Sequence, residues 1–400
     1  MSDVKSGPLA GVKVIELGTL IAGPFCSRLL GEFGAEVIKI EAPDGGDQIR
    51  GWRKMYEGTS LWWYVQARNK KSLTVNLREP EGQEIVRRLA READIVVENF
   101  RPGALEKWSI GWPQLSELNP RLIMVRLSGF GQDGPYRDRP GFGVVGEAMG
   151  GMRYVTGYGD RPPVRLGISI GDSIAALHGV IGAMMALHHR NVNGGKGQYV
   201  DVALYEAVFN MMESFIPEYD VLGFKRERAG NELPGITPSN TYPTRDGKYV
   251  IIGANNDSIF RRLMTAIERD DLANDASLAS NAGRVPRARE LDQAIETWTR
   301  ARDLKTVLET LERAEVPSGR VYDPEDILND THYAARRMIE QWQLPDGKPM
   351  KIPGVVPKLS ATPGETRWLG PTLGQHNSEI LGRLGYSEEQ QQSLKQSGVI

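Results

Sequence analysis

Asp172 is the acidic residue whose position most favours chemistry. It follows the segment Gly167–Gly171 and precedes the most apolar stretch of the chain, Ser173–Leu187. An aspartate at the start of a helix satisfies unpaired N–H groups and interacts favourably with the helix dipole. A carboxylate held by such donors stays ionised at neutral pH and can attack an electrophile without a general base. Spacing alone favours the helix cap, and the role of nucleophile is compatible with it.

Other common kinds of catalytic site lack their signatures. The five histidines are scattered, and the adjacent His188 and His189 point about 100° apart on a helix, so we expect no metal site. The chain has no G-x-S-x-G motif, and Cys26 lies in an apolar segment typical of a core residue. The turn Gly18–Gly23 lacks the G-x-G-x-x-G spacing of dinucleotide-binding proteins.

The composition indicates a soluble protein of ordinary charge. The chain has 400 residues, enough for two domains, and a formal net charge of -2, which gives no reason to expect nucleic acid or a membrane as a partner. The single cysteine excludes an internal disulfide, and the N-terminus lacks the apolar core of a secretory signal, so we expect a cytoplasmic protein. The stretch Ser173–Leu187 is shorter than the ~20 residues that span a bilayer, and is interpreted as a buried helix.

The first half of the chain alternates strand and helix patterns. Alternating branched residues predict strands at Val12–Leu17, Glu36–Glu41, Asp94–Glu98, Leu122–Leu127 and Tyr199–Leu204. Helical spacing predicts helices after Gly23 and at Pro80–Ala93, and an apolar helix from Asp172 to His189. This order favours the α/β class with an open, largely parallel sheet.

A polar segment rich in glycine and proline, residues 225–242, suggests a linker or mobile loop. After it we predict a strand and three helices, at Lys248–Gly253, Ser258–Ile267, Arg287–Ala301 and Leu304–Ala314. The predicted domains are a large one over 1–224, a small α+β domain over 225–320, and a C-terminal segment over 321–400 that returns to the large domain.

Eight segments in order along the chain resemble the class III CoA-transferases, the family that includes formyl-CoA transferase and carnitine CoA-transferase. They are Gly11–Leu17, Ala22–Pro24, Leu30–Glu41, Asn69–Ser72, Val97–Gly103, Ser128–Pro135, Gly167–Asp172 and Gly194–Gln198. The resemblance runs almost end to end.

The resemblance implies a large Rossmann-like domain, a smaller domain, an interlaced homodimer, and coenzyme A bound as a substrate with no tightly held cofactor. By position it places the nucleophile at Asp172. The expected CoA contacts are Ile21, Ala22, Val75, Arg78, Asn99, Phe100, Arg101 and Lys107. The three cations among them suit the pyrophosphate and 3′-phosphate of CoA.

The mechanism that the resemblance implies is a double displacement through an aspartyl anhydride and an aspartyl-CoA thioester. Oxygen and sulfur anions form repeatedly, so we expect backbone N–H groups such as that of Gly171 to stabilise them. Both intermediates are prone to hydrolysis, and the segment Gly230–Gly235 is a candidate lid against water.

Two departures bear on the substrate. The formyl-CoA enzymes carry a glutamine where this chain has Ile21, and a tetraglycine loop where this chain has only the segment Gly230–Gly235; both departures disfavour formate and oxalate. The tyrosine that those enzymes place near the thioester corresponds to Phe142. Three arginines, Arg153, Arg161 and Arg165, precede Asp172, and any of them could bind a second carboxylate. We therefore expect succinyl-CoA as donor and a C4–C5 dicarboxylate as acceptor.

Two alternatives remain open at this point. A 2-methylacyl-CoA racemase shares the fold, but its acid–base pair needs a histidine where this chain has Phe142. The second alternative is a catalytically idle protein that binds CoA without forming a covalent adduct.

Overall fold

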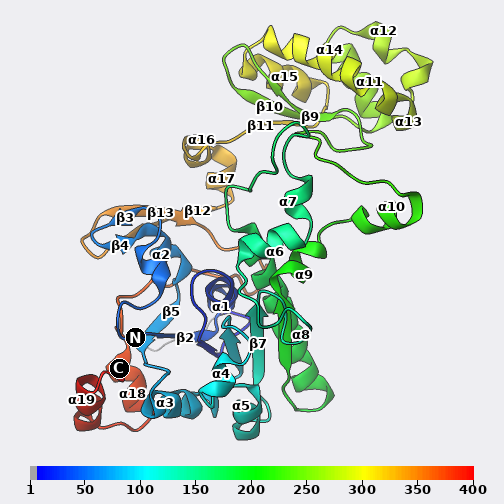
Figure 1. The fold of residues 1–400 in the computed structure, drawn as a ribbon. Helices are drawn as coiled ribbons and strands as arrows, with labels where there is room; N and C mark the ends of the chain where they lie inside the picture. The colour runs from blue at the N-terminus through cyan, green and yellow to red at the C-terminus, as the bar shows by residue number, and fades with distance from the viewer. Residues whose placement is uncertain (1–6) are drawn as a thin grey trace. The chain divides into compact units, whose positions relative to one another are not determined.

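The computed structural model describes residues 7–400, and the contacts divide the chain into two compact units (Figure 1). The first unit comprises Met1–Arg153, Leu166–Glu213 and Arg336–Ile400, and the second comprises Tyr154–Arg165 and Ser214–Ala335. The sequence analysis placed the start of the small domain at residue 225, after the observed start at Ser214, and its end at residue 320, before the observed end at Ala335. Those positions followed a change in polarity, whereas the contacts group α10 (Phe215–Leu222) with the second unit.

A six-stranded parallel sheet forms the centre of the first unit. Its strand order is β5-β2-β1-β6-β7-β8, and every neighbouring pair is parallel. The strands are β1 (Lys13–Glu16), β2 (Glu36–Glu41), β5 (Lys70–Thr74), β6 (Ile95–Glu98), β7 (Ile123–Ser128) and β8 (Tyr199–Ala203). The order reverses between β1 and β6, the arrangement of doubly wound folds, whose ligands bind beside this reversal at the carboxyl ends of the strands. The predicted α/β class with a Rossmann-like sheet is confirmed.

Helices cover both faces of this sheet, and successive strand residues point to opposite cores. Val14 packs with α1 (Ala22–Glu32) and α8 (Ile170–Asn193), whereas Ile15 packs with the helices of the other face. That other face is covered by α3 (Pro80–Ala90), α5 (Trp112–Leu118) and the C-terminal helix α18 (Asn377–Arg383). Figure 1 shows α18 and α19 (Glu388–Gln396) in red beside α3, so the chain end completes the first unit.

The second unit has its own core. Three antiparallel strands in the order β11-β10-β9 pack against the helices α11, α14 and α15. The elements are β9 (Ser239–Pro243), β10 (Tyr249–Gly253), β11 (Ser318–Arg320), α10, α11 (Asp257–Ala266), α12 (Asp270–Ala273), α13 (Asn281–Arg284), α14 (Ala288–Arg300), α15 (Leu304–Arg313), α16 (Pro324–Asn329) and α17 (Thr331–Ala335).

Short elements complete the described chain. They are β3 (Met55–Tyr56), β4 (Thr59–Ser60), α2 (Leu61–Gln66), α4 (Ala104–Lys107), α6 (Gly143–Met149), α7 (Met152–Val155), α9 (Leu204–Phe209), β12 (Ile339–Gln343) and β13 (Pro349–Pro353).

Helix α8 is longer and less buried than the sequence suggested. It runs for 24 residues, and its hydropathy of 1.5 together with its length is sufficient, on those grounds alone, for a membrane crossing. Only 44% of the apolar window is buried inside the structure, so the expectation of a buried helix holds for one face of α8 and not for the other. The sequence predicted this helix at Asp172–His189, and the structure extends it at both ends, to Ile170 and Asn193.

Four charged side chains are buried together among β1, β2 and β5. The ammonium of Lys39 lies 2.7 Å from the carboxylates of both Glu16 and Asp47, and that of Lys70 lies 2.7 Å from Glu16. All four side chains are at most 1% exposed. Burial opposes the ionisation of Glu16, but the two ammonium groups outweigh it and hold its pKa below the usual range. Burial lowers the pKa of Lys70 to about 8.

This buried ion cluster also holds the turn between β1 and α1. Lys39 Nζ donates to the carbonyl oxygen of Gly18 at 2.9 Å, and Asp47 Oδ1 accepts the N–H of Leu20 at 3.0 Å. Leu20 has a φ of 64°, a left-handed conformation that non-glycine residues rarely adopt. The contacts with Lys39 and Asp47 therefore stabilise a backbone conformation that is unfavourable for an isolated leucine.

Replacing Asp47 with alanine is expected to destabilise the first unit. The substitution leaves the Lys39 ammonium with one carboxylate in place of two and releases the N–H of Leu20, so we expect a loss of about 3–5 kcal/mol in the free energy of unfolding. Urea unfolding followed by circular dichroism measures it. Asp44→Ala, an exposed residue of the same loop, is the control and should change the free energy by less than about 0.5 kcal/mol. Equal effects of the two substitutions would contradict a structural role for the cluster.

Candidate active site

Asp172 lies in the first turn of α8, two residues after the first helical residue, Ile170. The residue before the helix is Ser169, so Asp172 is not the cap that the spacing favoured. Its carboxylate lies against the backbone of α6, because a Cβ atom at Gly143 would fall 2.1 Å from Asp172 Oδ2. Any residue other than glycine at 143 would therefore displace this carboxylate, and the N-terminal end of the 24-residue helix favours its negative charge.

A second carboxylate, that of Glu147 on α6, lies beside this helix start. Glu147 is 2% exposed, and its Oε1 accepts the N–H of Gly171 in a long hydrogen bond of 3.4 Å. Its Oε2 accepts hydrogen bonds from Arg153. The N–H of Gly171, which the sequence suggested as a donor to reaction anions, is therefore directed at a side chain of the protein.

The histidine nearest to Asp172 in the sequence is engaged elsewhere. The two ring nitrogens of His178 lie 2.9 Å from the carbonyl oxygen of Ile174 and 3.4 Å from Asn210 Oδ1. Phe142, at the position where a racemase would need its histidine, is 64% exposed. Within residues 7–400, no group of three or more histidine, cysteine, aspartate or glutamate side chains is arranged to hold a metal ion.

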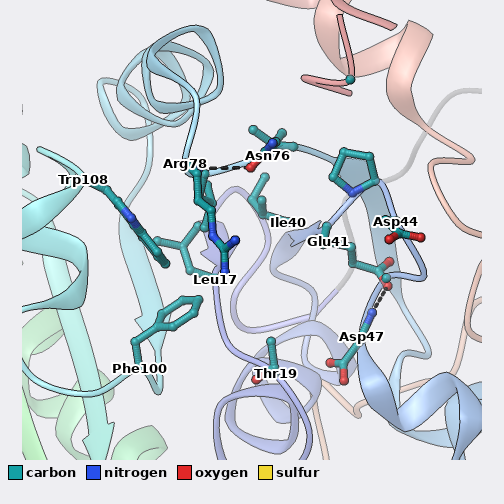
Figure 2. Close-up of a pocket in the computed structure, with 16 residues that line it drawn as sticks. Leu17, Thr19, Ile40, Glu41, Asp44, Asp47, Asn76, Arg78, Phe100 and Trp108 are labelled. Carbon is teal, nitrogen blue, oxygen red and sulfur yellow. Dashed lines mark hydrogen bonds between the residues drawn. The ribbon is translucent and has the colours of Figure 1, made fainter.

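A cavity of about 430 Å³ opens at the carboxyl ends of β1, β2, β5 and β6, beside the reversal of strand order (Figure 2). Most of its lining residues lie at or after these ends, among them Leu17 and Thr19 after β1, Glu41 on β2, Val75 after β5 and Phe100 after β6. This is the place where doubly wound folds bind nucleotides.

The cavity has a cationic, aromatic side and an acidic side. Figure 2 shows Arg78, Phe100 and Trp108 on one side and Asp44 and Asp47 on the other. The rings of Phe100 and Trp108 meet edge to face, with centroids 5.4 Å apart. Such a combination suits a flat heteroaromatic ring that carries a phosphate.

The structure brings some of the predicted CoA contacts together. Val75, Arg78 and Phe100 line the cavity. Arg101 and Lys107 are exposed and lie outside its lining.

The remaining three predicted contacts lie at or beside the start of α1. Ile21 and Ala22 are 8% and 3% exposed at the start of α1. Asn99 Oδ1 accepts the N–H of Thr19 at 2.8 Å, and its Nδ2 donates to the carbonyl oxygen of Thr19 at 2.9 Å. Asn99 thus bridges the ends of β1 and β6 with its side chain.

Glu98, the last residue of β6, supports the same edge of the sheet. It is 1% exposed, accepts the N–H of Phe100 at 2.8 Å and pairs with Arg126 at 2.8 Å. Burial raises the pKa of this carboxyl to about 7, although Arg126 opposes the shift.

Sequence reasoning missed the residues whose role depends on tertiary contacts. Trp108 and Asp47 line the cavity, while Gly143 and Glu147 contact the helix start of Asp172. The i, i+4 spacing of Gly143 and Glu147, directly after Phe142, is the one signal in the sequence that could have found them.

The candidate lid Gly230–Gly235 is fastened to another loop of the second unit. The N–H of Gly230 donates to the carbonyl oxygen of Gly157 at 2.8 Å, and Asn231 Nδ2 donates to Tyr158 Oη at 3.1 Å. A Cβ atom at Gly230 would fall 2.4 Å from the Tyr158 ring, so only glycine permits this contact.

Comparison with known proteins identifies the family. The family model described as CoA-transferase family III matches residues 9–377. The succinyl-CoA–D-citramalate CoA-transferase of Chloroflexus aurantiacus is 52% identical over 395 residues, with 98% of each chain covered. The succinyl-CoA–L-malate CoA-transferase beta subunit of the same organism is 42% identical over 398 residues, again with 98% of each chain covered.

A solved structure gives the same result. A CaiB/BaiF family protein from Brucella suis has a TM-score of 0.83 and 34% identity, and the match covers 95% of this chain and 100% of that one. The relatives do not favour the racemase or the idle CoA-binding protein. The expected resemblance is confirmed: this chain belongs to CoA-transferase family III and is a CoA-transferase.

Proposed function

We propose that this enzyme moves CoA from succinyl-CoA to a C4–C5 dicarboxylic acid, with Asp172 as the nucleophile. The contact of the Asp172 carboxylate with the backbone at Gly143 carries the assignment of the nucleophile, because glycine at this position leaves room for one carboxylate at a helix start. The substrate class is supported by the two Chloroflexus relatives, which are named for transfer from succinyl-CoA to D-citramalate and L-malate.

The chemistry proceeds by two exchanges at the carboxylate. Asp172 attacks the thioester carbonyl of the donor, CoA leaves as thiolate, and a mixed anhydride forms. The thiolate then attacks the aspartyl carbonyl, which releases the donor acid and leaves an aspartyl-CoA thioester. The acceptor carboxylate attacks that thioester to give a second anhydride and CoA thiolate, and attack by the thiolate on the acceptor acyl carbon restores Asp172.

The cavity beside β1 and β6 is the site we assign to the nucleotide end of CoA. Arg78 would pair with a phosphate, while Phe100 and Trp108 would contact the adenine ring. Arg101 and Lys107, exposed on the segment that follows β6, would meet the more distant phosphates.

We propose a homodimer in which a second copy covers the exposed face of α8. Four apolar side chains recur there at helical spacing, each more than a third exposed: Leu177, Ile181, Met184 and Met185. The opposite face of α8 belongs to the core of the first unit, so the helix is already committed to a folded domain. A water-exposed apolar stripe on such a domain is typical of a protein interface. On this view no membrane is involved, and acyl-CoA substrates with one unpaired, buried cysteine suit the cytoplasm.

Trapping with hydroxylamine tests the nucleophile. With succinyl-CoA present, hydroxylamine should convert the Asp172 side chain to a hydroxamate, which peptide mass spectrometry detects. Asp172→Ala should lower kcat at least about 1,000-fold, because no other group replaces a lost nucleophile. Asp270→Asn, an exposed aspartate at the start of α12 in the second unit, is the matched control and should retain full activity. Unmodified Asp172, or a fully active alanine variant, would overturn the mechanism.

Arg78→Gln tests the nucleotide site. Since Arg78 would bind a phosphate far from the reacting atoms, the variant should raise KM for succinyl-CoA about 10-fold with kcat nearly unchanged. A succinyl-pantetheine thioester, which lacks the nucleotide, should be used equally by the variant and the parent enzyme. The exposed Arg91→Gln serves as control, and an equal loss with both thioesters would exclude this cavity as the nucleotide site.

Ile181→Glu tests the dimer. A charge in the centre of the apolar stripe should shift the mass measured by light scattering from two chains to one, because a buried unpaired carboxylate opposes association. Lys305→Glu in the second unit should leave the dimer intact. A parent protein that is monomeric, or that requires detergent to stay in solution, contradicts the proposal.

A further inference from the structure

The three arginines that precede Asp172 differ in their surroundings. Arg161 and Arg165 are exposed within the second unit. Arg153, in contrast, belongs to the first unit with Asp172 and is half-buried against Glu147. The structure therefore separates side chains that the sequence left equivalent.

Glu147 joins Arg153 to the helix start that carries the nucleophile. One carboxylate oxygen, Oε1, faces the N–H of Gly171, and the other, Oε2, accepts from Nε and Nη2 of Arg153, both at 3.2 Å. A Cβ atom at Gly171 would lie 3.1 Å from Glu147 Cγ and 2.9 Å from the carbonyl oxygen of Gly143. Both the Cγ atom and the Oε1 atom of Glu147 therefore lie close to the backbone of Gly171.

The same face of α6 contacts both parts of the site. Gly143 and Glu147 are four residues apart and therefore lie on one side of the helix. Gly143 adjoins the Asp172 carboxylate, and Glu147 adjoins the residue before it. Glu147 consequently lies between Arg153 and the helix start that carries Asp172, to which the acyl group becomes attached.

The charge of Arg153 is only partly used. A guanidinium has five N–H donors, and Glu147 occupies the edge that Nε and Nη2 form. The Nη1 group takes no part in these bonds to Glu147, and the side chain is 27% exposed. One edge of a fixed cation thus remains available to a ligand.

We propose that Arg153 binds the distal carboxylate of the dicarboxylic acyl group and so determines the substrate class, an inference that rests on the proposed function. Asp172 and Glu147 already place two carboxylates in this part of the site, and a third from the substrate would be repelled without a cation. Arg153 supplies that cation in a geometry suited to carboxylate recognition. A monocarboxylic acyl group has no group to place against it.

Glu147 is then a positioning residue. It holds the guanidinium by its side edge and turns the remaining N–H groups to the substrate. It also offers the cation a carboxylate other than that of Asp172, whose pairing with Arg153 would weaken the nucleophile.

Kinetics with acceptors of equal length test the inference. The full-length enzyme, with succinyl-CoA as donor, is given glutarate or valerate, which differ only by a carboxylate in place of a methyl group. Arg153→Gln should lower kcat/KM for glutarate about 10- to 150-fold, the range for a hydrogen bond to a charged group, and alter that for valerate less than about 2-fold. Arg153→Lys should recover part of the glutarate preference because the charge remains.

The controls separate this inference from the proposed function. Arg161→Gln and Arg165→Gln should leave the ratio of the two acceptors unchanged, whereas Glu147→Gln should reduce it through the orientation of Arg153. A parent enzyme that transfers CoA to neither acid would contradict the proposed function itself. A parent enzyme that prefers glutarate, with the preference intact in both Arg153→Gln and Arg153→Lys, would overturn the role of Arg153 alone. Equal losses with both acceptors would overturn it too.

Discussion

Lys39, on the second strand from one edge of the parallel sheet, is buried with its ammonium between Glu16 and Asp47, and the rest of the first unit is arranged around this pairing. The charges come from β1, β2, β5 and the loop after β2, so removing any of them would leave an uncompensated charge in a dry interior. The same ammonium and carboxylate bind the backbone of the β1–α1 turn and hold Leu20 in a left-handed conformation. Strand pairing and turn geometry are therefore parts of one electrostatic arrangement.

The turn leads into α1, and α1 connects the two parts of the site. Its first residues follow the strand end that lines the cavity, while its body packs against α8, where a Cβ atom at Gly179 would lie 3.2 Å from Cys26 Sγ. Burial raises the pKa of that thiol to about 12, so Cys26 acts as a small core residue and carries no thiolate chemistry. A rigid α1–α8 contact gives the Asp172 helix a defined position relative to the strand ends.

Much of the fold could be predicted because its signals are local. Branched residues at alternate positions marked β1, β2, β6, β7 and β8, and apolar spacing marked α1 and α3. Strand β5 was not predicted: its first residue is a lysine, Lys70, which is buried because Glu16, distant in sequence, neutralises it. The exposed face of α8 was not predicted either, because a run of apolar residues does not show which of its faces other elements cover.

The sequence by itself determined the α/β class, the family resemblance and the candidate nucleophile Asp172, because strand periodicity and ordered motifs are properties of neighbouring residues. Only the tertiary structure decided which side chains share a site. Val75, Arg78 and Phe100 line one cavity, whereas the side chain of Asn99 binds the backbone of the turn after β1. Arg153 lies in the first unit and bonds Glu147, which distinguishes it from Arg161 and Arg165. The physical reason is that pairing and burial depend on contacts between residues far apart in the chain, such as Lys39 with Glu16 and Gly171 with Glu147, which no local pattern records.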